Sequence, residues 1–234
     1  MGGYADQMGV RAALFDIDGT LTTGGEVWGG LIHSPDVTRF SHVTLYAASL
    51  PHYALSKAGI VSQAGFRERW VGRMAGLMRG WSAEQVQAIY YRLAHDYLIP
   101  KLRPDTVEIL RQHKASGHIV LLVTTMFTGI AAEVAAYVGA DVGIGSPVEM
   151  RDGRCTGRLV GLPCAGARKI ACATAYLEQH QPEITPSACA AYGDSRSDIA
   201  FLAGVGFPVA VYPDDAMRAA AQQHGWRIYE GQGA

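Results

Sequence analysis

Short apolar runs that each end in a polar residue constrain the fold of this sequence most strongly. Four such runs lie at Val10–Phe15, Ile119–Val123, Ala188–Tyr192 and Phe207–Val211. Runs of this length are typical of strands that are buried on both faces of a parallel sheet. Helical patterns separate them, at Thr106–Lys114, Ile130–Val138 and Ala167–Gln179. This alternation predicts an α/β protein with a doubly wound, Rossmann-like parallel sheet.

The polar residues that follow these runs are expected to form one site. Asp16 follows the first run, Thr124 and Thr125 follow the second, and Gly193 and Asp194 follow the third. The fourth run precedes Pro213 and two aspartates, Asp214 and Asp215. In sheets of this kind, ligands bind in a crevice beyond the carboxyl ends of the strands. We therefore expect these side chains to meet in that crevice.

The first crossover is too long to be a single helix. Asp18 and Thr124 lie about a hundred residues apart, whereas a parallel connection needs only about a dozen. The intervening segment is helical by pattern at Pro35–Ser49, Phe66–Met78 and Ala83–Tyr97. We predict a core of residues 1–23 and 100–234 and an inserted helical cap of residues 24–99 that covers the crevice. The expected hinges are Gly24, Gly25, Gly29 and Gly30 on one side and Pro100–Pro104 on the other.

A hairpin is expected outside the main sheet. The pair Asp152-Gly153 lies between two short extended runs, and Asp-Gly is a strong hairpin-turn signal. We predict this hairpin over Pro147–Leu162.

Composition excludes several classes of protein. Twenty Lys and Arg against 21 Asp and Glu give a net charge of -1, so we expect neither a nucleic-acid nor a membrane partner. No apolar run approaches the roughly 18 residues of a membrane span, and Met1–Gln7 does not resemble a signal peptide. The four cysteines form no C-x-x-C pair and are expected to stay reduced. These features predict a cytoplasmic protein. We expect a monomer or a homodimer, although composition does not determine which.

Two aspartates follow the first run in Asp16-Ile17-Asp18-Gly19-Thr20. In an extended segment, side chains two residues apart share a face, so both carboxylates could act on one bound group. One could attack phosphorus, and the other could protonate the leaving oxygen. A tight turn or a calcium loop uses the same residue types, although Thr22–Gly24 supply none of the further acids that a calcium loop needs.

Three later features could serve the same phosphoryl chemistry. Thr124 and the backbone N–H groups after it could hold phosphate oxygens, although threonine also suits a strand. Lys169 opens a helix and could neutralise a phosphoryl group and Asp16, or it could be a solvated helix lysine. Gly193-Asp194-Ser195-Arg196-Ser197-Asp198 offers hard oxygen ligands for Mg²⁺, or an aspartate there could cap a helix.

The order and the strand-end placement of these motifs resemble the haloacid dehalogenase superfamily of phosphohydrolases. Its signature is D-x-D-G-T, then a Thr or Ser, then a Lys, then G-D-x-x-x-D. The resemblance covers nearly the whole chain, Ala12–Pro213, including the place and size of the cap. A helical, C1-type cap after the first motif resembles the phosphoserine-phosphatase-like branch (subfamily IB), as do the stretches Asp152–Arg158 and Asp194–Pro208.

The resemblance implies a role for each motif residue. Asp16 would be the nucleophile and an Mg²⁺ ligand. Asp18 would be the general acid and then the general base, and its backbone carbonyl would be a second ligand. Thr124 and Lys169 would bind the phosphoryl group. Asp194 would ligate Mg²⁺, and Asp198 would support the metal site.

The sequence departs from phosphoserine phosphatases beside the phosphate site. There the second motif continues Ser-Gly-Gly-Phe, whereas here it is Thr124-Thr125-Met126-Phe127, so the side chain of Thr125 replaces bare backbone. Glu26 lies one place from the usual spacing of the cap glutamate that receives an amino group. Arg73 is a counterpart of the cap arginine that grips a carboxylate, or an exposed helix arginine. These three residues are the substrate-binding candidates.

Together, these features predict an Mg²⁺-dependent phosphomonoesterase that hydrolyses a small phosphorylated metabolite through an aspartyl-phosphate. A phosphotransferase or phosphomutase would use the same chemistry, and a strict phosphoserine phosphatase is a narrower alternative. A non-catalytic, phosphate-sensing module would share only the fold. Five ring-bearing residues of the cap could line the substrate pocket or form the cap's core: Trp28, His33, Tyr46, His52 and Trp70.

Overall fold

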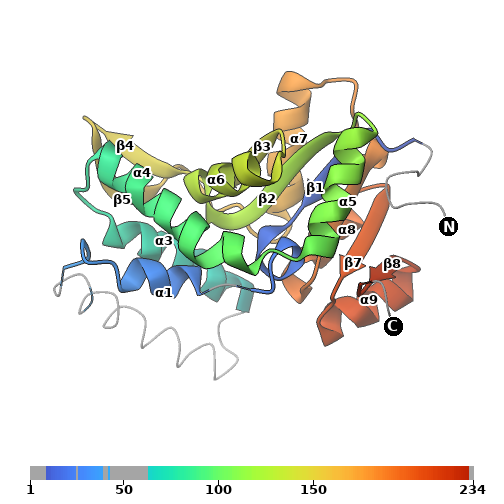
Figure 1. Cartoon of the computed structure of the whole chain (residues 1–234), viewed down its shortest axis with the longest axis horizontal. Coiled ribbons are helices and arrows are strands. Elements are labelled where there is room, and N and C mark those ends of the chain that lie inside the picture. Colours follow the sequence, from blue (N-terminus) through green and yellow to red (C-terminus); the bar gives the residue numbers. More distant parts are fainter. Residues whose placement is uncertain (1–8, 25, 39–41, 43–62, 232–234) are drawn as a thin grey trace.

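A six-stranded parallel sheet forms the centre of the computed structural model, which describes residues 9–24, 26–38, 42 and 63–231 (Figure 1). The strand order is β3-β2-β1-β6-β7-β8, and all neighbours pair in parallel. The strands are β1 (Ala12–Phe15), β2 (Ile119–Phe127), β3 (Val142–Ser146), β6 (Cys189–Gly193), β7 (Phe207–Val211) and β8 (Arg227–Tyr229). The predicted doubly wound parallel sheet is confirmed.

Helices cover both faces of this sheet (Figure 1). One face packs against α5 (Pro104–Ala115) and α6 (Thr128–Val138), and the other against α7 (Arg168–His180), α8 (Ile199–Ala203) and α9 (Asp215–His224). In β1, Ala13 and Phe15 join the first core, whereas Ala12 and Leu14 join the second. Because successive strand residues point to opposite faces, burial on both sides requires a strand that is apolar throughout.

The predicted hairpin is also confirmed. Strands β4 (Val148–Arg151) and β5 (Arg154–Leu159) pair in antiparallel fashion in a sheet of their own. At the turn, Asp152 has φ 49° and Gly153 has φ 72°, which are the positive values that a tight hairpin turn requires. Strand β5 packs against helix α3 (Gln63–Leu77).

The inserted segment is helical in its described part. Its helices are α1 (Val27–Ile32), α3 and α4 (Ala83–Arg92), and α4 continues as a wider helical turn at Leu93–Leu98. The expected capping box opens α4, with the side chains of Ser82 and Gln85 each accepting from the other's backbone N–H. Most of the predicted helix Pro35–Ser49 lies outside the described residues. The cap boundaries at 24 and 99 stay a prediction.

Two of the predicted hinge glycines have a different role. Gly29 and Gly30 lie inside α1. A Cβ on Gly30 would lie 2.7 Å from the ring of Tyr97, so a glycine here allows two helical segments to pack closely. The two chain connections between core and insertion run side by side, and the Thr23 N–H donates to the Lys101 carbonyl at 2.9 Å.

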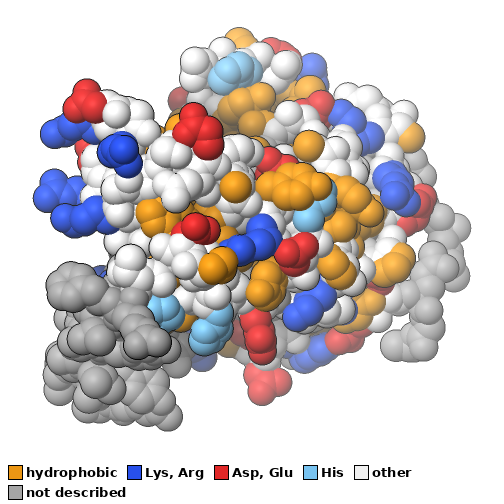
Figure 2. All heavy atoms as spheres, turned by 60° about the vertical axis from the view of Figure 1, so that its left-hand side comes forward, with side chains coloured by type: hydrophobic (Ala, Val, Ile, Leu, Met, Phe, Trp, Pro, Cys, Tyr) orange, Lys and Arg blue, Asp and Glu red, His pale blue; other side chains and the backbone are white. Residues whose placement is uncertain are grey.

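The surface carries charged side chains of both signs, interspersed with hydrophobic ones on the face that Figure 2 shows. Large exposed hydrophobic residues include Tyr91, Tyr137, Met150, Val160 and Leu162. Within the described ranges, the helices lack the combination of length and apolar character that a membrane crossing requires.

Candidate active site

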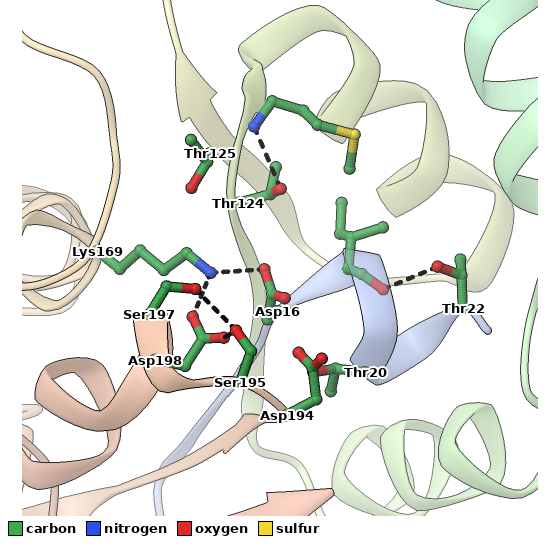
Figure 3. A network of polar contacts seen from close by, with 12 residues as sticks. Asp16, Thr20, Thr22, Thr124, Thr125, Lys169, Asp194, Ser195, Ser197 and Asp198 are labelled. Atoms are coloured by element: carbon green, nitrogen blue, oxygen red, sulfur yellow. Dashed lines mark hydrogen bonds and ion pairs between the residues drawn. The ribbon is translucent and has the colours of Figure 1, made fainter. Parts of the chain in front are cut away.

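Three adjacent strands bring the first motif residues together. Asp16 directly follows β1, Asp194 directly follows β6, and Thr124 lies in β2 on the other side of β1. Figure 3 shows their side chains converging on one region. The crevice predicted at the carboxyl ends of these strands is therefore present, and it gathers residues that are far apart in the sequence.

Strand β2 does not end before Thr124, as the sequence suggested. It continues to Phe127, with a shift in its register to β3 between Val123 and Phe127. Its pairing with β1 stops at Leu122. The extension is held because the Ser146 hydroxyl donates to the Thr125 carbonyl at 2.8 Å. Thr124 thus lies in the part of β2 that is no longer paired with β1, and it lies near Asp16 at the end of β1.

The loop after Asp16 depends on a glycine. Gly19 has φ +90°, and a Cβ there would lie 2.1 Å from Oδ2 of Asp194. Only glycine combines this backbone conformation with so close an approach. The hydroxyl of Thr20 donates to Oδ1 of Asp194 at 3.1 Å. The sequence alone indicates no separate role for Thr20, although Thr20 completes the D-x-D-G-T motif.

Lys169 connects two of the carboxylates (Figure 3). It lies in the first turn of α7 and is 3% exposed. Its Nζ donates to Oδ1 of Asp16 at 2.7 Å and to Oδ1 of Asp198 at 2.5 Å. The lysine is therefore a buried, charged group beside Asp16 and not a solvated helix lysine.

Negative charge exceeds positive charge in this cluster. Carboxylate oxygens of Asp16, Asp194 and Asp198 all lie within 4.8 Å of one another. Burial raises the pKa of Asp16 well above its ordinary value; Lys169 opposes this shift, and the charges of Asp198 and Asp194 add to it. Burial, followed by the charge of Asp198, raises the pKa of Asp194 to about 7.

The charge of Lys169 does not balance the three carboxylates. Burial alone would lower the pKa of Lys169, but Asp16 and Asp198 outweigh it, so the pKa is raised and the ammonium group persists. One ammonium group then faces three carboxylates. Converging carboxylate oxygens are the ligands that Mg²⁺ prefers, and a divalent cation would relieve their repulsion. The residues present therefore fit such an ion.

Side chains to which the sequence assigns no individual role hold the loop after β6. The Ser195 hydroxyl donates to Oδ2 of Asp198 at 3.0 Å and lies 2.7 Å from the Ser197 hydroxyl. The N–H of Asp214 donates to the Asp194 carbonyl at 2.8 Å, and Oδ2 of Asp214 accepts from the Arg196 N–H at 2.9 Å. Asp214 follows the next apolar run in the sequence, but it has no role there because it joins this loop only in the folded chain.

Several of these groups line one side of a cavity of about 480 Å³. Its lining includes the motif residues Asp16, Asp18, Thr124, Thr125, Lys169 and Asp194, together with Trp28, Trp70, Val71 and Met126. The Thr124 side chain is buried, and its hydroxyl oxygen accepts from the Met126 N–H at 3.3 Å. The site therefore combines polar groups at the strand ends with apolar groups above them.

Two of the predicted substrate-binding residues do not line this cavity. Glu26 is exposed at the start of α1, and Arg73 lies half-buried on α3, but neither is part of the cavity wall. Thr125, the third candidate, does line it. His33 is exposed, whereas Tyr46 and His52 fall outside the described residues.

Comparisons with known proteins agree with this geometry. The family model for haloacid dehalogenase-like hydrolases matches residues 13–203. Phosphoserine phosphatase SerB1 of Mycobacterium tuberculosis is 29% identical over 220 residues, which cover 93% of this chain and 70% of that protein. A Bordetella pertussis Tohama I protein of unknown function has a similar crystal structure, with TM-score 0.76, 25% identity and coverage of 94% and 98%. A phosphoserine phosphatase with a phospho-aspartyl intermediate analogue shares the fold, with TM-score 0.60, 18% identity and coverage of 95% and 94%.

Proposed function

The chain belongs to the haloacid dehalogenase-like hydrolase family, and we propose that it is an Mg²⁺-dependent phosphomonoesterase that acts on a small phosphorylated metabolite through an aspartyl-phosphate. The observation that carries this proposal is the buried cluster in which Asp16 faces both the cavity and the ammonium group of Lys169. The names of relatives such as phosphoserine phosphatase SerB1 also support a phosphatase.

The cluster offers a set of groups that would hold Mg²⁺. These are the carboxylates of Asp16 and Asp194 and the backbone carbonyl of Asp18, with Asp198 supporting the site from beside Lys169. When bound, the ion supplies positive charge that offsets the charge of the phosphoryl oxygens and the carboxylates. Lys169 supplies a second positive charge beside Asp16.

In the first step, a carboxylate oxygen of Asp16 attacks phosphorus in line with the ester oxygen. The new O–P bond forms as the P–O bond to the substrate breaks, and Asp18 transfers its proton to the departing alkoxide. Thr124 and Lys169 hold the phosphoryl oxygens during the transfer. The products of this step are the free alcohol, an aspartyl-phosphate on Asp16 and an ionised Asp18.

In the second step, Asp18 takes a proton from a water molecule, and the hydroxide oxygen attacks phosphorus. The bond between Asp16 and phosphorus breaks, which releases inorganic phosphate and restores the carboxylate. Asp18 ends the cycle protonated, as it began. The proton count therefore balances over one turnover without any histidine.

The test is phosphate release from a panel of phosphate monoesters, in Mg²⁺ and in EDTA. We expect Mg²⁺-dependent release by the wild type and none by Asp16→Asn. The matched control is Asp152→Asn in the exposed hairpin turn, which should keep full activity because asparagine tolerates the same positive φ. An active, folded Asp16→Asn variant would contradict the nucleophile assignment. Transfer to an added alcohol in preference to water would instead indicate a phosphotransferase.

A further inference from the structure

The cavity above the cluster has two chemically different halves. Its charged lining groups, Asp16, Asp18, Lys169 and Asp194, all come from the strand-end loops and the first turn of α7. Helices α1 and α3 contribute Trp28, Trp70 and Val71, and β2 contributes Met126. The phosphoryl group belongs at the charged half, so the alcohol part of the ester must occupy the apolar half.

The apolar half is a fixed surface. The ring of Trp28 packs edge-on against Phe127, with ring centroids 5.2 Å apart and an interplanar angle of 79°. Val71 and Met126 are buried at 2% and 4% exposure. Trp28 and Trp70 are only partly buried, so each indole keeps surface that can contact a ligand.

Among the described lining residues, this half has no charged side chain that could pair with a charged substrate group. Neither Glu26 nor Arg73 reaches the cavity wall. A carboxylate group placed against Trp28 and Trp70 would therefore lose its water without gaining a partner of opposite charge from the described residues of this half, which is costly. An uncharged ring would lose little and gain contact with both indoles.

We propose that the substrate is a phosphate monoester whose alcohol carries a flat, uncharged aromatic ring packed against Trp28 and Trp70. This inference rests on the proposed phosphatase function and narrows its substrate class. A volume of about 480 Å³ falls in the range of small-ligand pockets and accommodates a phosphoryl group with one ring system.

The experiment compares kcat/KM for benzyl phosphate, cyclohexylmethyl phosphate and phosphoserine. All three release alkyl alcohols, and the first two differ mainly in the flatness of the ring. We expect benzyl phosphate to exceed cyclohexylmethyl phosphate by about fivefold and phosphoserine by more than about tenfold. In Trp28→Leu and Trp70→Leu, the ratio of the two ring esters should fall towards one. Tyr137→Leu, which alters an exposed ring outside the cavity lining, should leave that ratio unchanged.

Binding of the matching phosphonates separates failure of this inference from failure of the proposed function. Phosphonates cannot be hydrolysed, so calorimetry measures recognition alone. We expect phenethylphosphonate to bind more tightly than cyclohexylethylphosphonate and than the phosphonate analogue of phosphoserine. Tighter binding of the amino-acid analogue, or equal binding of the two rings, would overturn the aromatic pocket. The expected binding order without hydrolysis of any ester would retain the pocket and reject the phosphatase.

Discussion

Single residues in this site are constrained by distance as much as by chemistry. Gly19 is the clearest case, because its missing side chain lets the Asp194 carboxylate approach the loop that carries Asp16 and Asp18. Thr20, the next residue, then holds the same carboxylate with a hydrogen bond of 3.1 Å. The glycine and the threonine of the D-x-D-G-T motif are therefore explained by their contacts with the carboxylate of Asp194, which lies more than a hundred residues away in the sequence.

Gly19→Ala should lower activity by about a hundredfold or more. Its Cβ would lie 2.1 Å from Oδ2 of Asp194, and displacing a catalytic group by about 1 Å can cost about a hundredfold in rate. Gly80→Ala is the matched control, because Gly80 also has a positive φ, of 83°, but nothing lies within 4 Å of its Cβ position. The positive φ should cost each variant about 1 kcal/mol in stability, and the clash with Asp194 should add to the loss in Gly19→Ala; urea unfolding measures both losses. Equal activity of the two variants would contradict the close approach.

Lys169→Met should destabilise the protein most strongly when Mg²⁺ is absent. Removing one partner of a buried ion pair costs about 3–5 kcal/mol, and here it would leave three carboxylates without their ammonium group. Added Mg²⁺ should restore part of that stability. The control is Lys114→Met, whose ion pair with Asp141 is about one-third exposed and is worth at most about 1 kcal/mol. Equal losses in the two variants would show that the Lys169 cluster contributes no more than a surface pair.

At the scale of elements, the sheet could be predicted from its apolar runs, whereas elements that depend on neighbours could not. Strand β3 contains Gly143 and Gly145, which by pattern suggest a turn. In the fold, a Cβ on Gly143 would lie 2.2 Å from the backbone of Ala131 in α6, and one on Gly145 would lie 2.5 Å from the Met126 carbonyl oxygen. These two glycines let β3 pack closely against α6 and β2, and the sequence alone does not reveal these contacts. Strand β8 has three residues, which is too short for a periodic signal.

The site residues likewise fall into those that local sequence indicates and those whose role depends on distant contacts. The sequence singles out Asp16, Lys169 and Asp194 because each lies at a strand end or a helix start, and it singles out Thr124 because an apolar run precedes it. The sequence places Asp214 after a strand but gives it no role, because its contribution is a contact between two loops. It caps α9 by accepting from the Met217 N–H at 2.7 Å and also holds the loop that carries Asp194.

Asp214→Ala should weaken Mg²⁺ binding as well as stability. Loss of the helix cap should cost about 1 kcal/mol, and loss of the bond to the Arg196 N–H should loosen the Asp194 loop and raise the Kd for Mg²⁺. Ser82→Ala removes a cap of similar value from α4, away from the cluster, and should lower stability without changing that Kd. Calorimetric Mg²⁺ titration distinguishes them. An unchanged Kd in Asp214→Ala would limit Asp214 to its capping role.

At the scale of the whole molecule, a buried histidine contributes to the pH dependence of stability. His113 of α5 shares hydrogen bonds with the Tyr192 hydroxyl at 2.6 Å and with His118 at 2.8 Å, and its ring packs edge-on against Phe15. Burial, followed by the charge of His118, lowers the pKa of His113 from 6.5 to about 4. The neutral imidazole is therefore the form that links α5 to β6.

Stability should consequently fall as the pH drops from about 6.5 towards 4. In that range the unfolded chain binds a proton at His113 and the folded chain does not, so the free energy of unfolding decreases by about 1.4 kcal/mol per pH unit. Above pH 6.5 this contribution is fully present. His113→Gln should show a shallower decline in urea unfolding between these pH values, whereas the exposed His180→Gln should match the wild type. Parallel declines in all three proteins would contradict the buried neutral His113.

Asp16 is proposed to carry the phosphoryl group between two steps, and the most direct test is to locate that group on the enzyme. Acetyl phosphate is a suitable donor because acetate leaves without the proton that Asp18 supplies. In Asp18→Asn, which cannot activate water, peptide mapping by mass spectrometry after an acid quench should find the phosphoryl group on Asp16. Asp16→Asn should carry none. A phosphoryl group on another residue, or hydrolysis by Asp18→Asn with no phosphoryl group on the protein, would contradict the two-step mechanism.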